Sequence, residues 1–336
     1  KPYILFLTTV IFLSPNPGFA QDEDTQYNPI VYTSVDGKEL KPAIKGVLCS
    51  NSKKNRYKDG VGSIICKDPI VNIGNAAFAA SQTLSSMILP EGVESIGSEA
   101  FQDCSELESI ELSGSLETIG GGAFKGCSKL KEITLPENLK TIGSRAFEGC
   151  SRLKKIIVPQ GVAIIGESVF DGCTDLKEIV ILSHDAVISD GAFRGCSGRL
   201  SLMYDLPDEA YSTLLSGSSF EIIDLMPGVQ SIGNHALEGY SSLTRLTIPQ
   251  TVSHIGRFAL YGFNGSLSNK SIADMLGKVL VYESEMRPET MMDIWEGHIV
   301  ESRYSAGKGM LAFDEVIDNI PEAAFAGDKS LRKVFI

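Results

Sequence analysis

The sequence predicts an elongated, β-rich α/β solenoid in which short coils stack and share one continuous core. Two observations carry this prediction. The five cysteines between residues 104 and 196 are 23 residues apart, and the five phenylalanines from Phe101 to Phe193 keep the same step. With small variations, each step also repeats the pattern I-G-x-x-A-F-x-x-C-x-x-L-x-x-I-x-L-P. Such a period indicates stacked repeats, because a single unit of this length cannot bury its own apolar side chains.

The second half of each unit predicts a short strand. Ile133 and Leu135 alternate with polar residues, which is typical of a strand buried on one side. Pro136 ends the strand because proline has no N–H group to donate. We therefore expect a right-handed solenoid with a parallel sheet along one face. Its strands should include residues 107–112, 130–135, 153–158 and 176–181.

The first half of each unit predicts a corner and a compact turn. The glycine of the I-G pair suits a corner where φ is positive or where another backbone comes close. The A-F-x-x-C segment is too short for a long helix, so we expect one helical or 3₁₀ turn opposite the sheet. In this turn the phenylalanine fills the interior of the coil.

The cysteines divide into a ladder of five and a separate pair. Equivalent residues in stacked coils are about 4.8 Å apart with parallel Cα–Cβ directions, whereas the Cβ atoms of a disulfide are about 3.5–4.5 Å apart. The ladder cysteines should therefore be free, buried thiols, and they are Cys104, Cys127, Cys150, Cys173 and Cys196. Cys49 and Cys66 lie outside the ladder and form either a disulfide or two more buried thiols.

The repeat pattern resembles the BspA-type leucine-rich repeat of secreted and surface bacterial proteins. The resemblance rests on the spacing I-G-x-x-A-F-x-x-C-x-x-L-x-x-I-x-L-P, which recurs in register from residue 94 onwards. It implies a leucine-rich-repeat solenoid with a parallel sheet along one face. It also implies adhesion, or binding to host or bacterial proteins, and it brings no catalytic residues.

Three regions are expected along the chain. Residues 1–20 follow the pattern of a signal peptide, with an apolar run from Tyr3 to Leu13, small residues before Gln21 and no lipid-anchor cysteine at position 21. The apolar run is shorter than the about 20 residues that span a bilayer, and no transmembrane segment is expected. We therefore expect a secreted or cell-surface protein.

The rest of the chain is expected to hold a capping segment and the repeat array. Residues 21–70 should form an N-terminal β hairpin that caps the column, with a turn at Asp36–Gly37. Residues 71–336 should form the array, about 11 coils long. Irregular coils are expected near 198–224, with a short helix within 205–217, and near 264–315.

Composition and motifs argue against several kinds of chemistry. The formal net charge of −12 disfavours nucleic acid and anionic membranes as partners. The sequence contains no nucleophile, phosphate-loop or zinc-protease motif, and its four histidines are scattered over different repeat slots. We therefore predict a protein that is not an enzyme and has no cofactor, no catalytic residues and no metal site.

The candidate functional surface is the outward side of the predicted sheet. Its charged side chains lie between the buried leucine and isoleucine positions, and they are Glu108, Glu111, Lys131, Glu132, Lys154, Lys155, Lys177 and Glu178. Columns of lysine and glutamate are often only a solvated face. The extended sheet of a repeat protein is nevertheless where partners bind. Lys131, Lys154 and Lys177 form one column of this face, which favours an acidic protein loop or an anionic glycan as the partner.

Two functions remain open. The leading one is an exported, non-catalytic interaction protein that binds an extracellular protein or glycan through the repeat surface, in adhesion or in contact with a host or other bacteria. The alternative is an enzyme or polysaccharide-processing accessory factor with a site in the irregular coils, which lack a paired-acid or nucleophile motif.

Overall fold

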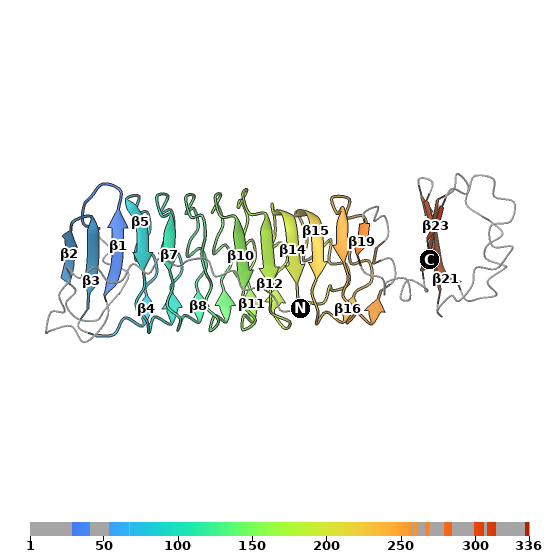
Figure 1. Cartoon of the computed structure of the whole chain (residues 1–336), viewed down its shortest axis with the longest axis horizontal. Helices are drawn as coiled ribbons and strands as arrows, with labels where there is room; N and C mark the ends of the chain where they lie inside the picture. The colour runs from blue at the N-terminus through green and yellow to red at the C-terminus, as the bar shows by residue number, and fades with distance from the viewer. Residues whose placement is uncertain are drawn as a thin grey trace.

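The computed structural model describes residues 29–40, 54–66, 68–256, 259–260, 266–268, 279–283, 299–305, 308–313 and 333–335. The predicted signal peptide and much of the predicted irregular segment at 264–315 lie outside the described residues. Between residues 68 and 256 the chain winds as an elongated β-solenoid, with coils stacked along one axis (Figure 1). Two sets of strands run along this column, and hydrogen bonds between neighbouring coils build both of them.

The longer strands form what we call the long-strand sheet. They are β5 (Leu84–Ile88), β7 (Ser109–Glu111), β10 (Lys155–Val158), β12 (Glu178–Ile181), β14 (Ser197–Leu202), β15 (Ser219–Leu225), β17 (Arg245–Thr247) and β19 (Ser266–Ser268). β5 pairs with β7, and β10 to β19 pair in chain order, always in parallel. Ile156 lies opposite Ile179, one repeat later. The parallel sheet and the 23-residue coil are thus confirmed.

One predicted strand is missing. Residues 107–112, 153–158 and 176–181 contain β7, β10 and β12, but residues 130–135 form no strand. This segment still stacks between its neighbours, since Lys131 N–H donates to Glu108 O at 3.4 Å and Lys154 N–H donates to Lys131 O at 3.3 Å. These bonds are longer than the usual 2.9–3.0 Å. The long-strand sheet is therefore divided between β7 and β10.

Shorter strands form what we call the short-strand sheet. In the described part of the chain they are β4 (Asn72–Ile73), β6 (Ser95–Ile96), β8 (Thr118–Ile119), β9 (Thr141–Ile142), β11 (Ile164–Ile165), β13 (Val187–Ile188), β16 (Ser231–Ile232) and β18 (His254–Ile255). The first six form one parallel sheet, and β16 pairs with β18. A Cβ atom added at Gly143, just after β9, would lie 2.5 Å from the backbone nitrogen of Gly121. Glycine is needed there because the preceding coil comes close.

The turn that follows the short strand is not helical. The prediction of a helical or 3₁₀ turn is wrong for the described coils, which contain no helix. In the coil of Phe101, φ is +58° at both Glu99 and Asp103. The N–H groups of Glu99, Phe101 and Asp103 donate to the next coil at 2.7–2.9 Å, while those between them bond within their own coil. A helix directs every N–H back along its own chain, so hydrogen bonding to the neighbouring coil opens this segment into successive turns.

Three antiparallel strands lie at the N-terminal end of the long-strand sheet. They are β1 (Ile30–Ser34), β2 (Lys54–Lys58) and β3 (Val61–Ile65), in the order β2-β3-β1-β5 (Figure 1). β1 ends near a turn at Gly37 and pairs antiparallel with both β3 and β5. The buried Tyr32 ring fills the space over Gly62, where an added Cβ atom would lie 2.0 Å from the ring. These strands cover the edge that β5 would otherwise expose.

The coil at residues 197–225 joins the regular stack. β14 and β15 pair in parallel, with a register shift between Gly198 and Arg199. The helix expected within 205–217 is absent, and Glu209 there adopts a φ of +53°, as the equivalent residues of other coils do. The slip at Gly198 therefore changes the register of the strand and not the type of turn.

Four strands of the C-terminal part pair antiparallel. They are β20 (Val279–Glu283), β21 (Ile299–Ser305), β22 (Lys308–Phe313) and β23 (Lys333–Phe335), in the order β21-β22-β20-β23. The sequence predicted a single repeat array over residues 71–336, which includes these four strands. Among the described strands, the parallel pairing typical of the array extends as far as β19.

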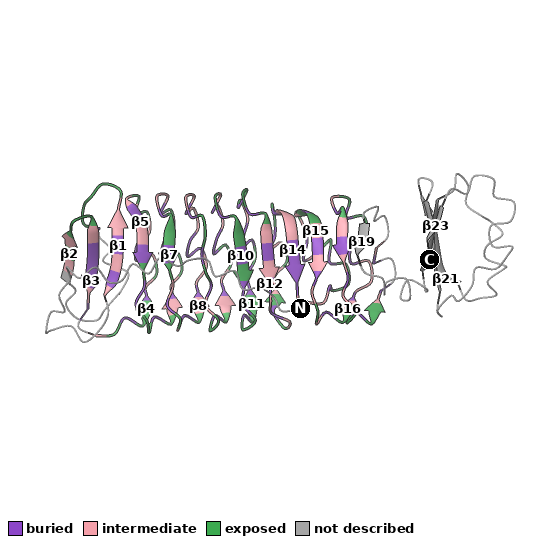
Figure 2. Cartoon of the chain, viewed as in Figure 1, coloured by how far each residue is buried: buried purple, intermediate pink, exposed green. Residues whose placement is uncertain are grey.

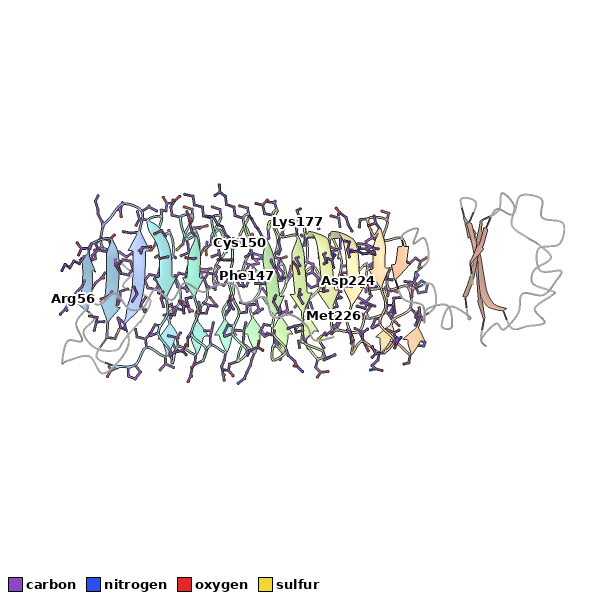
Figure 3. All side chains as sticks on the ribbon, viewed as in Figure 1. Arg56, Phe147, Cys150, Lys177, Asp224 and Met226 are labelled. Atoms are coloured by element: carbon purple, nitrogen blue, oxygen red, sulfur yellow. The ribbon has the colours of Figure 1, made fainter. Side chains whose placement is uncertain are left out.

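Buried residues follow one another along the whole solenoid (Figure 2), and their side chains form one continuous core. The rings of Phe101 and Phe124 are 5.2 Å apart with planes 1° from parallel, and Phe124 stacks on Phe147 at 5.4 Å. Phe147 and Cys150 are both fully buried (Figure 3). Each coil thus buries its ring against the coils before and after it, which is why the repeats depend on one another.

Candidate functional site

The outward face of the long-strand sheet carries the side chains that the sequence singled out. Seven of the eight are exposed and Glu178 is half-buried. They come from four consecutive coils, at residues 108–111, 131–132, 154–155 and 177–178. The inward positions of the same strands, such as Ile156 and Ile179, are buried. The predicted face is therefore solvent-accessible along its length.

Backbone register stacks these side chains into columns. Lys155 lies opposite Glu178, and Ile157 opposite Val180. Lys154 N–H donates to Lys131 O, and Lys177 N–H donates to Lys154 O at 3.0 Å. Neighbouring strands are about 4.8 Å apart, so each charge lies close to the equivalent charge of the next coil.

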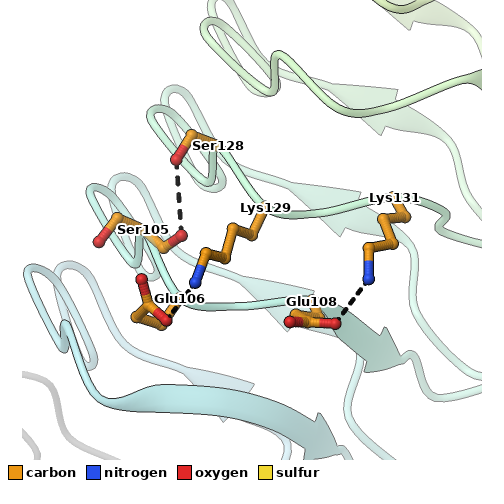
Figure 4. A network of polar contacts seen from close by, with 6 residues as sticks. All are labelled: Ser105, Glu106, Glu108, Ser128, Lys129 and Lys131. Carbon is orange, nitrogen blue, oxygen red and sulfur yellow. Dashed lines mark hydrogen bonds and ion pairs between the residues drawn. The ribbon is translucent and has the colours of Figure 1, made fainter. Parts of the chain in front are cut away.

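Some of these charges neutralise one another. Lys131 Nζ lies 2.7 Å from Glu108 Oε2, and Lys155 Nζ lies 2.8 Å from Glu178 Oε1 (Figure 4 shows the first pair). The hydrogen bond and the charge of Lys131 lower the pKa of the Glu108 carboxyl below its usual value. Both pairs are about half exposed, and such pairs contribute little to stability. Because of these pairs, however, Lys131 and Lys155 are not unpaired cations.

The same pairing occurs at the edge where the strands begin. Lys129 Nζ lies 2.5 Å from Glu106 Oε2, and Ser128 Oγ donates to Ser105 O at 3.5 Å (Figure 4). Each contact joins residues one repeat apart. The coil at residues 128–131 thus turns its two cations toward the acidic coil before it.

Sequence reasoning missed a second polar cluster on this face. Arg199 Nη1 lies 2.7 Å from Asp224 Oδ2, and Thr247 Oγ1 donates to Asp224 Oδ1 at 2.6 Å. Lys177 Nζ donates to Ser197 Oγ at 3.0 Å. The register slip at Gly198 hid Arg199, because a strict count of 23 from Glu178 reaches Ser201. Aligning Leu200 with Ile179 would have placed Arg199 in the column of Glu178.

The cysteine ladder is buried in the core and is structural. Cys104, Cys127, Cys150, Cys173 and Cys196 are free and buried, as predicted. The Sγ atoms of the first four donate to phenylalanine carbonyls of the preceding coil at 3.1–3.2 Å. Burial raises the pKa of all five thiols. Such thiols are poor nucleophiles and poor metal ligands.

Cys66 is buried and disulfide-bonded, which settles its state between the two alternatives left open by the sequence. Its expected partner, Cys49, lies outside the described residues. The bonded cysteine directly follows β3, the strand that pairs with both β1 and β2. The disulfide therefore lies in the N-terminal segment, apart from the ladder.

A pocket of about 230 Å³ is lined by residues 160–163 and 183–185, at corners of the solenoid. In the described part of the chain, no cluster of three or more His, Cys, Asp or Glu side chains could hold a metal ion. Nor does that part contain a helix that is long and apolar enough to cross a membrane.

The alternative site, in the irregular coils, has less structural support. Within 198–224, the described residues form two strands of the regular sheet and a turn like those of other coils. Much of 264–315 lies outside the described residues. The outward face of the long-strand sheet is therefore the candidate site that the structure supports best.

Comparisons with known proteins agree with the repeat architecture. The family model described as "BspA type Leucine rich repeat region" matches residues 71–199 and 205–280, in 6 copies. It is a model of a repeat and not of an enzyme. A search of curated proteins found no match.

Solved structures of bacterial repeat proteins are similar to this chain. A leucine-rich repeat protein from T. pallidum is 25% identical, with 56% of this chain and 67% of that chain covered and a TM-score of 0.34. One from Bacteroides ovatus is 20% identical, with 64% and 90% covered and a TM-score of 0.32. A leucine-rich cell surface protein from Faecalibacterium prausnitzii is 18% identical, with 61% and 64% covered and a TM-score of 0.32.

Proposed function

Since this chain belongs to the BspA-type leucine-rich repeat family, we propose that it is an exported, non-catalytic interaction protein. It binds an extracellular protein or glycan through the outward face of the long-strand sheet, in adhesion or in contact with a host or other bacteria. The sequence of residues 1–20 supports export, because it follows the pattern of a signal peptide.

The observation that carries this proposal is the contrast between the two sides of the strands. The inward positions repeat the same apolar residues, because each must fit between identical neighbours. The outward positions vary from coil to coil, from Glu111 through Thr134 and Ile157 to Val180. A regular surface whose side chains vary without disturbing the core suits recognition of a partner.

The charges on this face favour a negatively charged partner. The chain carries a formal net charge of −12, yet Lys131, Lys154 and Lys177 stack in one column of this face, and of these three Lys131 alone is paired with a carboxylate in the described part of the chain. A local cationic column on an acidic protein favours an anionic partner, such as an acidic protein loop or an anionic glycan. Its attraction should weaken as the salt concentration rises.

The proposal is tested by affinity capture from secreted and host extracellular material with the full chain. Reversing Lys131, Lys154 and Lys177 to glutamate should reduce capture of the partner by about tenfold or more. The free energy of unfolding should change little, because exposed charges contribute little.

Lys140→Glu is the control, since Lys140 is exposed and paired with Glu117 beside the short-strand sheet. This control should capture the partner as the parent does. A partner captured equally well by the parent and the triple variant would show that this face is only scaffold.

A further inference from the structure

One coil of the long-strand sheet departs from the pattern of paired charges. Arg152 and Lys154 occupy the slots that hold Lys129 and Lys131 one repeat earlier and Glu106 and Glu108 two repeats earlier. Lys129 and Lys131 turn back to the two glutamates. In the equivalent slots, the preceding coil therefore offers Arg152 and Lys154 only cations that already have partners. Its exposed carboxylate, Glu132, forms no ion pair with either of them in the described part of the chain.

The following coil does not neutralise these two cations either. Lys177 stacks next to Lys154 and donates to the neutral Ser197 hydroxyl. Lys155 takes one carboxylate of that coil, Glu178, at 2.8 Å. The other, Asp175, occupies the slot next to Arg152 and forms no ion pair with it in the described part of the chain. Across the described residues, neither Arg152 nor Lys154 forms an ion pair or a side-chain hydrogen bond, and both are exposed. Like charges in one column raise the free energy of the unbound face.

An apolar side chain is exposed on the same coil. Ile157 is 44% exposed, although it belongs to β10 and alternates with the buried Ile156 and Val158. Its cross-strand neighbour Val180 is half-buried on the same side of the sheet. Two unpaired cations thus lie on the same coil as an aliphatic surface in the middle of the array.

We propose that Arg152, Lys154 and Ile157, here called the 152–157 patch, are the centre of the partner-binding face. Its partner is a protein segment that carries carboxylates beside an aliphatic side chain. This inference rests on the proposed function and names the partner's chemistry. Partner carboxylates take the unpaired guanidinium and ammonium groups, and the partner's aliphatic side chain covers Ile157.

A protein segment fits this patch better than a glycan does. The outward positions of β7, β10 and β12 and of the coil at residues 131–134 hold no aromatic residue. They therefore lack the flat rings on which sugars stack, whereas an aliphatic side chain needs only an aliphatic surface such as Ile157 and Val180. Arginine also binds carboxylates in a two-pronged geometry that a lysine cannot provide.

The test measures binding of defined probes to the full chain. The probes are a labelled synthetic peptide that alternates aspartate with leucine, the same peptide with serine in place of leucine, and polygalacturonate as an anionic glycan. The aspartate–leucine peptide should bind the parent best, and added salt should weaken its binding.

Three variants locate the site. Arg152→Gln with Lys154→Gln should weaken binding of the aspartate–leucine peptide by about tenfold or more. Ile157→Thr should remove the preference for leucine over serine in the probe. The charge-matched control, Lys125→Gln with Lys140→Gln, removes two cations that are paired with Glu148 and Glu117, and it should bind as the parent does.

Several results would overturn the inference. They are equal binding by the Arg152/Lys154 variant and the parent, stronger binding of polygalacturonate than of the peptide, and no binding of any probe by the parent. Loss of a captured natural partner on reversal of Lys131, Lys154 and Lys177, but not on change of Arg152 and Lys154 to glutamine, would also overturn it. That last result would leave the proposed function standing, because the face would still carry the partner.

Discussion

The Sγ atom of Cys150 donates a hydrogen bond to the carbonyl oxygen of Phe124 in the preceding coil, at 3.2 Å. The same carbonyl accepts the N–H of Cys127 at 3.1 Å. Cys104, Cys127 and Cys173 make the equivalent thiol contact in their own coils. The ladder therefore joins consecutive coils by hydrogen bonds inside the core.

The buried ladder predicts thiols that are inert in the folded protein. Burial raises the pKa of Cys104 to about 12 from an ordinary 9.0, and Cys173 behaves in the same way. Alkylation should modify none of the five ladder cysteines in the folded chain and all of them after unfolding. Mass spectrometry of the alkylated peptides measures this, and a disulfide between two ladder cysteines would contradict it.

The same shift predicts loss of stability in alkali. The pKa of each ladder thiol is higher in the folded state than in the unfolded state, so the thiol contributes stability that is fully present below about pH 9. That contribution is lost as the pH rises toward about 12. Denaturant unfolding at increasing pH should show the decline, and a Cys104→Ala/Cys173→Ala chain should show less of it.

The stacked rings predict a large loss of stability in the middle of the column. Phe124→Ala should lower the free energy of unfolding by about 3–5 kcal/mol, because it leaves a cavity between Phe101 and Phe147. Phe124→Leu is the control, and it should lose less because it refills most of that space. Thermal and denaturant unfolding measure both variants, and equal losses would contradict the account.

The glycine of the I-G pair predicts a steric effect. Gly143→Ala should destabilise by about 3 kcal/mol or more, because its Cβ atom would lie 2.5 Å from the Gly121 backbone nitrogen, which cannot move without the whole coil. Gly122→Ala is the control, since its nearest contact would be 3.5 Å away and its only strain is a φ of +61°. A greater loss at Gly122 than at Gly143 would show that conformation and not close approach selects the glycine.

The Glu108–Lys131 pair predicts a shifted titration. The hydrogen bond from Lys131 lowers the pKa of Glu108, so this carboxylate stays charged at pH values where an ordinary glutamate is partly protonated. The pair's contribution to stability is present above the ordinary glutamate pKa and is lost as the pH falls through the lowered value. NMR titration should return the pKa of Glu108 toward the ordinary value in Lys131→Gln. Lys140→Gln should leave it unchanged.

The repeat in the sequence was sufficient to predict stacking, parallel pairing and the identity of the buried residues. The reason is geometric: a fixed step of 23 places Phe101, Phe124 and Phe147 above one another in any stacked arrangement. Equivalent residues then meet across every pair of coils. The same geometry predicted that the ladder cysteines are free thiols, because parallel Cα–Cβ directions disfavour disulfides.

Tertiary structure decided the turn conformation, the register near Gly198 and the pairing of surface charges. Short segments such as A-F-x-x-C favour a helical turn locally, and only hydrogen bonds to the next coil open that turn. The step from Glu178 to Arg199 is two residues shorter than the repeat (199 − 178 = 21), and the register shift between β14 and β15 recovers part of the difference, which a count along the chain does not reveal. Whether Lys131 or Lys154 is an unpaired cation depends on the coil that precedes it. Long side chains choose their partners in space, after the stack has formed.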